Sequence, residues 1–171
     1  MDDTCISYEG KDMKCEDINI CRNCYFRNGT PSCWAIQDPL KWYTKEWGYC
    51  RGEEAMMNEI FARGPVASCV NDTRKGGIWE TYKSGILVDP HPEDNGGSTH
   101  CIVIVGWGIK DSVKYWITRN SWGTYWGIEN EDGPGYGHIR RGSNDFGIES
   151  GCMWATIDPT PRGGSGTFWG K

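Results

Sequence analysis

The stretch THCIVIVGWG (residues 99–108), followed by KYWITRNSWG (residues 114–123), decides the fold. The first stretch holds five consecutive apolar residues, the pattern of a strand buried on both faces. The second alternates and ends in glycine, as another strand would. An antiparallel pairing of the two would bring His100, which opens the first strand, beside Asn120, which ends the second. We therefore expect these two side chains to meet.

The flanking sequence predicts one helix and further short strands. Residues 53–62, EEAMMNEIFA, carry apolar side chains at helical spacing, begin with acids and are followed by a Gly-Pro stop. Strands are expected at 66–70, 136–142 and 153–157, strand and turn within 76–88, and an exposed loop over 89–98. This order predicts an α+β fold, with an antiparallel sheet or half-open barrel and one or two flanking helices.

The two ends of the chain differ from this middle part. Residues 1–50 are rich in cysteine, show no sustained period and are expected to be loop-rich. Residues 51–157 hold the predicted helix and sheet. Residues 158–171, DPTPRGGSGTFWGK, form a Pro/Gly-rich tail that we expect to be disordered or draped over the surface.

Nine cysteines constrain the chemistry, and five of them fall within the first 33 residues. That density is typical of a disulfide-stapled secreted or lumenal segment. The alternatives are reduced structural thiols, or zinc bound through the pair Cys21 and Cys24, for which no second pair follows at a suitable spacing. We expect no metal and no cofactor. Asn28 and Asn71 open Asn-x-Thr triplets, which makes both candidates for N-glycosylation on a secretory route.

Charge and hydropathy exclude several partners. The formal net charge is −5 and no basic stripe appears, which argues against binding nucleic acid or an anionic membrane. No apolar run approaches the roughly 18 residues that span a bilayer. The opening residues, MDDTC, are acidic and polar, so they do not have the pattern of a signal peptide.

The segments around His100 and Asn120 resemble the histidine and asparagine blocks of the papain-like cysteine peptidases, which include the cathepsins. Three further segments agree with that resemblance: MMNEIFARGPVAS, GGIW and RRGSNDFGIESGC. The resemblance spans about residues 2–157. It implies the C-terminal, right-hand lobe of the papain-like fold together with the segment that joins the two lobes.

The chemistry of this family explains why these residue types occur together. A cysteine nucleophile needs an imidazole that holds it as thiolate and later protonates the leaving amine. The imidazole needs a partner on its other ring nitrogen, and an Asn amide oxygen serves without adding charge. We predict His100 as the base and acid, Asn120 as its orienting partner, and Trp122 and Trp107 as supporting residues, with Trp122 excluding water from the hydrogen bond. The plain alternative for a strand histidine is a core residue.

The other histidines and several tryptophans lack this context. His91 is flanked by proline and His138 lies within a predicted strand, so both are expected to be structural. Trp79, Trp116 and Trp154 are expected in the core.

The resemblance also implies three disulfides, a location and a missing partner. It pairs Cys5 with Cys21, Cys24 with Cys33, and Cys69 with Cys152. It assigns Cys15 to a cysteine of the absent lobe and gives no partner for Cys50 or Cys101. It implies a lysosomal or secreted protein.

Cys33, in GTPSCWAI, has the Ser-Cys-Trp context of the family's nucleophile but not its surroundings. His100 follows it by 100 − 33 = 67 residues, where roughly 130–150 are expected. Pro39 would end any helix that began at Cys33, and no Gln precedes it to build an oxyanion hole. We therefore expect Cys33 to be structural and the nucleophile to be absent from this chain.

Three functions remain open on this basis. The chain is expected to be part of a cysteine-type peptidase that acts on peptide substrates when complemented by a cysteine-bearing lobe. The alternative is a natural, truncated and inactive half-domain with a structural or interaction role, in which a protein partner covers the exposed lobe face. The third is an unrelated sandwich-like binding module.

Overall fold

The structure is a computed structural model that describes residues 6, 11–73, 77–93 and 97–164. The chain divides into two compact units. One comprises Met1–Tyr43 with Ile157–Lys171, and the other comprises Thr44–Thr156. No helix in the described part of the chain is long and apolar enough to cross a membrane.

The first unit contains a short helix, η1 (Asp17–Asn19), and an antiparallel hairpin of β1 (Arg22–Arg27) and β2 (Thr30–Ala35). Asn28 and Gly29 form its two-residue turn with φ of 51° and 78°, the left-handed geometry that a tight hairpin turn requires. The expectation that residues 1–50 are loop-rich was therefore wrong for this segment. Asn-Gly between two short runs is a strong hairpin signal, which the glycosylation triplet Asn28-Gly29-Thr30 shares.

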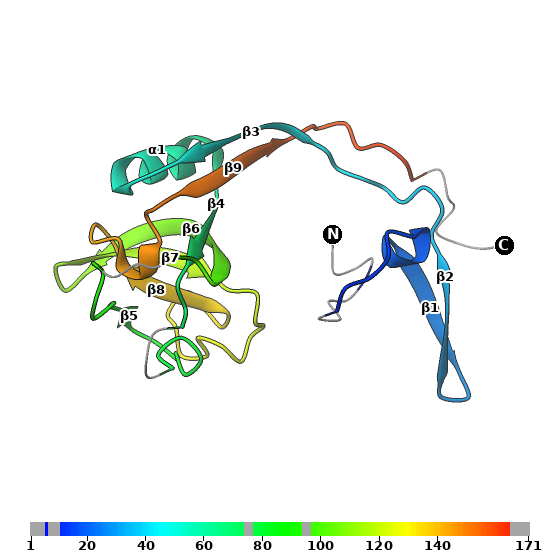
Figure 1. Ribbon diagram of the computed structural model, residues 1–171, viewed down its shortest axis with the longest axis horizontal. Coiled ribbons are helices and arrows are strands. Elements are labelled where there is room, and N and C mark those ends of the chain that lie inside the picture. The colour runs from blue at the N-terminus through cyan, green and yellow to red at the C-terminus, as the bar shows by residue number, and fades with distance from the viewer. Residues whose placement is uncertain (1–5, 7–10, 74–76, 94–96, 165–171) are drawn as a thin grey trace. The chain divides into compact units, whose positions relative to one another are not determined.

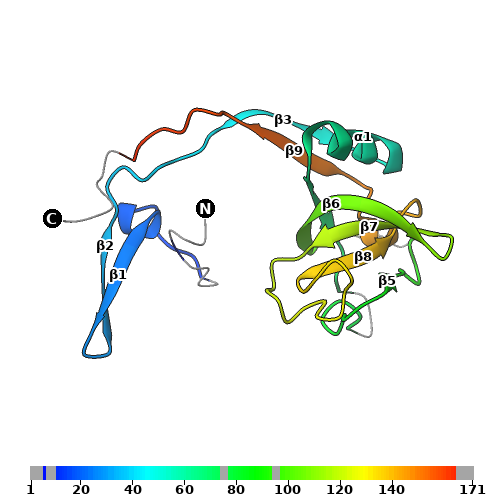
Figure 2. The same cartoon turned by 180° about the vertical axis from the view of Figure 1, so that it is seen from behind.

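The second unit is a seven-stranded sheet in the order β3-β9-β4-β6-β7-β8-β5, with one α-helix (Figure 1). Its elements are β3 (Thr44–Cys50), α1 (Glu53–Arg63), β4 (Val66–Val70), β5 (Ile86–Leu87), β6 (His100–Lys110), β7 (Val113–Arg119), β8 (Tyr136–Arg140), η2 (Asp145–Gly147) and β9 (Cys152–Ile157). The pairs β4–β6, β4–β9, β6–β7 and β7–β8 are antiparallel, and the short β5 runs parallel to β8. Helix α1 packs beside β3, β4 and β6, near the β3–β9 end of the sheet in both views (Figure 2). The α+β class and the predicted sheet with a flanking helix are confirmed.

Two sequence expectations differ from this arrangement. The boundary expected at residue 51 left residues 44–50 outside the sheet, whereas β3 occupies them and forms its edge. Strand β6 was expected to be buried on both faces. Instead Ile102 and Ile104 are buried while Cys101 and Val103 are exposed, because only one face of the strand meets the core.

The tail also has some order where it is described. Arg162 forms an isolated antiparallel bridge with Lys41, with reciprocal backbone hydrogen bonds of 2.8 and 3.0 Å. The guanidinium of Arg162 lies over the Tyr43 ring, 4.8 Å from its centroid. Residues 165–171, including the rest of the expected tail, lie outside the described residues.

The core of the second unit is built on large aromatic residues. Trp79, Trp116, Trp126 and Phe146 are fully buried, and Trp154 packs at the edge of this cluster. The indole N–H of Trp116 donates to the Glu149 carboxylate at 2.9 Å, so its one polar atom is satisfied. The expected core positions of Trp79 and Trp116 are therefore confirmed. Burial of such large rings explains how a chain of modest apolar content holds a packed sheet.

Candidate active site

His100 and Asn120 meet at one end of the β6–β7 ladder. His100 is the first residue of β6, and Asn120 directly follows β7, whose last residue, Arg119, lies opposite Val103. His100 Nε2 lies 2.9 Å from Asn120 Oδ1. An amide oxygen can only accept, so Nε2 carries the proton and donates it. The other ring nitrogen, Nδ1, has no hydrogen-bond partner among the described residues and is available to a reacting group.

Asn120 is held by its own backbone as well as by its side chain. Its N–H donates to the Gly135 carbonyl at 2.9 Å, and Oδ1 also accepts the Ser121 N–H at 2.7 Å. The residue is 7% exposed. Its Nδ2 is buried and has no hydrogen-bond partner within the described part of the chain. The amide oxygen is thus fixed in place before any substrate arrives, as a pre-organised orienting group should be.

Two indole rings enclose the imidazole. The Trp122 ring lies 5.0 Å from the His100 ring, tilted by 31°, and the Trp79 ring meets it edge-on at 6.4 Å. Trp122 therefore lies beside His100, where the sequence predicted it. Trp107 lies elsewhere: it is opposite Trp116 in the β6–β7 ladder and packs against the core, so its predicted support of the site is not a direct contact.

All four cysteines of the second unit form disulfides. Cys50 pairs with Cys152, and Cys69 pairs with Cys101. The expected Cys69–Cys152 pairing was wrong, and strand register explains why. Cys152 lies opposite Ser68, while Cys69 lies opposite Cys101. Because neighbouring residues of a strand point to opposite faces, Cys69 points away from Cys152.

The remaining cysteines lie in the first unit. Cys24 and Cys33 face each other across the β1–β2 hairpin and form the expected disulfide, so the Cys33 thiol is not free. Cys21 is disulfide-bonded, and its expected partner Cys5 lies outside the described residues. Cys15 is exposed and carries a free thiol.

The other predicted residues separate into exposed and buried positions. Asn28 lies exposed at the tip of the β1–β2 hairpin, whereas Asn71 is 9% exposed and its Oδ1 accepts from the N–H and the hydroxyl of Thr73. His91 is exposed, with Nδ1 3.4 Å from Glu93, and His138 is buried beside Asp132. Within the described residues, neither of these histidines contacts His100 or Asn120.

Comparisons with known proteins identify the family of the chain. Residues 2–156 match the family described as "Papain family cysteine protease". The chain is 32% identical to cathepsin Z of Onchocerca volvulus over 90% of its own length and 48% of the relative's. It is 31% identical to human cathepsin O, over 73% of the chain and 34% of the relative. The chain thus spans about half the length of the first of these relatives and a third of the second.

Solved structures give the same result. A procathepsin B of Trypanosoma congolense superposes with a TM-score of 0.55 at 25% identity, covering 70% of this chain and 38% of that protein. A digestive procathepsin L2 of Tenebrio molitor gives 0.56 at 28% identity, over 66% and 34%. The family match, over residues 2–156, covers most of the chain and includes both His100 and Asn120. The chain therefore belongs to the papain family of cysteine proteases.

Proposed function

We propose that the chain is the histidine-bearing part of a cathepsin-like cysteine peptidase, in which His100 and Asn120 serve a thiol that the chain itself does not supply. One observation carries this proposal. His100 donates Nε2–H to Asn120 and leaves Nδ1 free, yet every cysteine of the same unit is in a disulfide. This arrangement supports the imidazole half of a cysteine peptidase centre, because such a centre needs a base beside its thiol.

The reaction follows from the free ring nitrogen. His100 Nδ1 takes the proton of the incoming thiol, and the thiolate attacks the carbonyl carbon of the peptide bond. The imidazolium, held by Asn120 Oδ1, then donates that proton to the departing amine, leaving a thioester. Nδ1 next takes a proton from water, whose oxygen attacks the thioester. The carbon–sulfur bond then breaks, the acid product leaves, and the departing thiolate regains its proton from the imidazolium.

A second lobe must supply the rest of the centre. The thiol and the donors that stabilise the oxyanion would come from it, as would much of the substrate groove. The chain covers 48% of the cathepsin Z relative, which leaves length for such a lobe in a protein of that size. The substrate class is peptides. The exposed Cys15 is suited to a disulfide with that lobe. Lysosomal or secreted placement is part of the same proposal, since the disulfides require an oxidising route.

The second candidate is an inactive half-domain that binds a protein partner. Its support is an apolar surface on one face of β3 and β9. Gly48 faces Trp154, so strand alternation places Trp47, Tyr49 and Met153 on the opposite face. There Trp47 is 64% exposed and Tyr49 is 70% exposed. Large exposed aromatic side chains side by side mark interaction surfaces.

Complementation distinguishes the two functions. The purified chain is assayed with fluorogenic peptides, alone and after mixing with the separately expressed cysteine-bearing N-terminal half of a cathepsin Z. We expect hydrolysis only in the mixture, lost in His100→Ala and kept in His91→Ala, which alters an exposed histidine away from the site. Hydrolysis by the chain alone would contradict the first function. A stable complex without hydrolysis would favour the second.

A further inference from the structure

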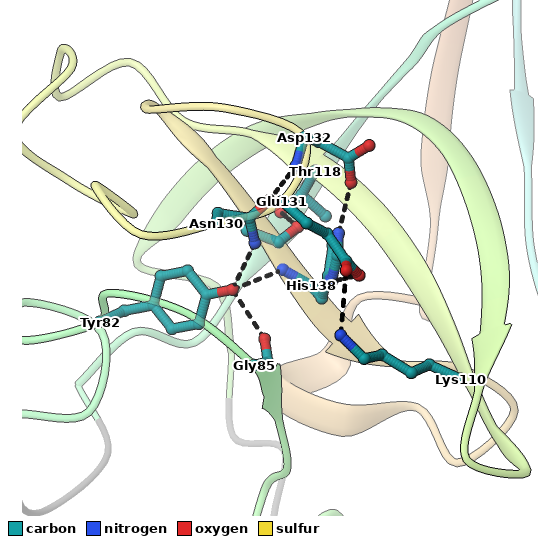
Figure 3. Close-up of polar contacts among 9 residues, drawn as sticks. Tyr82, Gly85, Lys110, Thr118, Asn130, Glu131, Asp132 and His138 are labelled. Carbon is teal, nitrogen blue, oxygen red and sulfur yellow. Dashed lines mark hydrogen bonds and ion pairs between the residues drawn. The ribbon is translucent and has the colours of Figure 1, made fainter.

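Residues 127–135, between Trp126 and β8, are here called the 127–135 loop. Hydrogen bonds and ion pairs hold this loop, and none of its residues belongs to the hydrophobic core. Figure 3 shows the residues that make these contacts from outside the loop. Tyr82, which precedes β5, bonds Asn130; Lys110, the last residue of β6, pairs with Glu131; and His138 on β8 pairs with Asp132. Beside them is a cavity of about 460 Å³, lined by Gly85, Lys110, Asn130, Glu131 and His138 among others. With a cavity along one side, the loop depends on its hydrogen bonds for a fixed position.

The Tyr82 hydroxyl makes the buried hydrogen bonds among these contacts. It accepts the Asn130 side-chain N–H at 2.7 Å and the His138 backbone N–H at 3.1 Å, and it donates to the Gly85 carbonyl at 2.7 Å (Figure 3). Burial raises the pKa of the Tyr82 hydroxyl, so it remains protonated and keeps its donor. The backbone carbonyl of Tyr82 also accepts the Gly127 N–H at 3.2 Å. One residue thus holds both the start and the middle of the loop.

The end of the loop reaches the catalytic pair. Asn130 accepts the Gly133 N–H at 3.0 Å, which forms the turn into Gly135. Gly135 donates its N–H to the Trp126 carbonyl at 2.8 Å and accepts the Asn120 N–H at 2.9 Å. Any movement of Asn130 is therefore passed through a short, hydrogen-bonded turn to the backbone of Asn120.

We propose that Tyr82 is a positioning residue for this site: its hydroxyl fixes the 127–135 loop and thereby places Asn120 Oδ1 against His100 Nε2. The catalytic meaning of this role rests on the proposed function, whereas the placement itself is a property of the chain alone. The sequence does not indicate this role, because a tyrosine in a turn-rich segment has no pattern that reveals its hydrogen bonds.

The ion pair between Lys110 and Glu131 provides a matched control. Lys110 Nζ lies 2.9 Å from Glu131, but both side chains are half exposed, so water and salt weaken their attraction. Removing Lys110 leaves every hydrogen bond of Tyr82 in place. If Tyr82 is the main anchor of the loop, the loop should therefore keep its position when the Lys110–Glu131 ion pair is removed.

The experiment measures hydrogen exchange at His100 Nε2 by NMR in the chain labelled with ¹⁵N-histidine and ¹⁵N-tryptophan, which has three histidines and ten tryptophans to assign. The Trp116 indole N–H, buried and bonded to Glu149, serves as the reporter of global opening. In Tyr82→Phe we expect His100 Nε2–H to exchange about tenfold faster or more, relative to Trp116, because the three hydrogen bonds of the hydroxyl are lost, including the one that holds Asn130 of the loop. In Lys110→Met the ratio should match the wild type.

Asn130→Ala tests the same link without altering the tyrosine, and it should also raise the ratio. The proposal is overturned if Tyr82→Phe and Asn130→Ala keep the wild-type ratio. It is equally overturned if exchange at His100 and Trp116 rises by the same factor, since Tyr82 would then act only on global stability. Neither result depends on the complementation assay, so failure of the peptidase proposal would be seen separately.

Discussion

The amide oxygen of Asn120 lies 2.9 Å from His100 Nε2, and it has no proton to offer. This one contact settles the tautomer of the imidazole, because the proton must sit on Nε2. It also decides which nitrogen can do chemistry. In the proposed function Nδ1 exchanges protons with a thiol and a leaving group, so the orienting role proposed for Asn120 and the basic role proposed for His100 both follow from this one hydrogen bond.

Loss of that hydrogen bond should slow the complemented peptidase. In Asn120→Ala the imidazolium loses a charge-assisted partner, which predicts a fall in kcat of about 10- to 100-fold. His100→Ala removes the base and acid itself and should cost about 10²- to 10⁴-fold. Steady-state kinetics of the mixture measure both. Asn58→Ala, an exposed asparagine on α1, is the control and should behave as the wild type.

The disulfide pattern is directly testable. Proteolysis without reduction, followed by mass spectrometry, should yield linked peptides for Cys50–Cys152 and Cys69–Cys101. Replacing Cys50 and Cys152 together by serine should lower the free energy of unfolding by about 2–5 kcal/mol, because that link closes the longest loop of the unit. A peptide joining Cys69 to Cys152 would show that the register of β4 is different.

Asp145 should make the fold more stable in acid. Its carboxyl is buried, accepts the Asp89 N–H at 2.7 Å and lies 3.0 Å from Arg140. Burial raises its pKa above the ordinary 3.8, despite Arg140 and the hydrogen bond from Asp89. A raised folded-state pKa gives stability that is complete below the ordinary value and is lost as the pH rises through the folded-state value.

The corresponding experiment is urea unfolding across that pH range. Asp145→Asn should remove part of the decline in stability that the wild type shows as pH rises. The exposed Asp111→Asn should keep the wild-type slope. Identical slopes in the wild type and Asp145→Asn would mean that burial does not govern this carboxyl.

The two Asn-x-Thr triplets should differ in use. We propose that Asn28, exposed at a hairpin tip, carries an N-linked glycan, and that Asn71, buried and bonded to Thr73, does not. The protein secreted from a eukaryotic host should lose mass on treatment with an N-glycosidase. Asn28→Gln should abolish that loss and Asn71→Gln should leave it. Loss of the glycan in Asn71→Gln alone would reverse the assignment.

The sequence predicted those parts of the fold that depend on local pattern. The helix Glu53–Arg63 follows from its apolar spacing and Gly-Pro stop, and the His100–Asn120 contact follows from two adjacent strands. Disulfide partners depend on which residues of distant strands lie opposite each other, a register that spacing along the chain does not contain. Cys50 and Cys101 therefore had no assigned partner, and Cys69 had the wrong one.

The sequence predicted the contact between His100 and Asn120 and the place of Trp122 beside them, but not the hydrogen bonds that surround Asn120. His100, Asn120 and Trp122 are close in sequence or joined by one ladder, so motif and strand logic reach them. The role proposed for Tyr82 runs through Asn130 and Gly135, which lie 48 and 53 residues further along the chain, and Gly135 accepts the backbone N–H of Asn120. Backbone contacts carry no residue-type signature, and only coordinates reveal them.

The central claim is that His100 serves a thiol outside this chain, and thiol labelling tests it most directly. The purified chain is treated with a peptidyl electrophile that alkylates cysteine peptidase nucleophiles, and labelled sites are mapped by mass spectrometry in the wild type and in His100→Ala. We predict no cysteine whose labelling depends on His100, with any reaction at the free Cys15 equal in both proteins. Labelling of Cys33, or of any other cysteine of the chain, that disappears in His100→Ala would contradict the account.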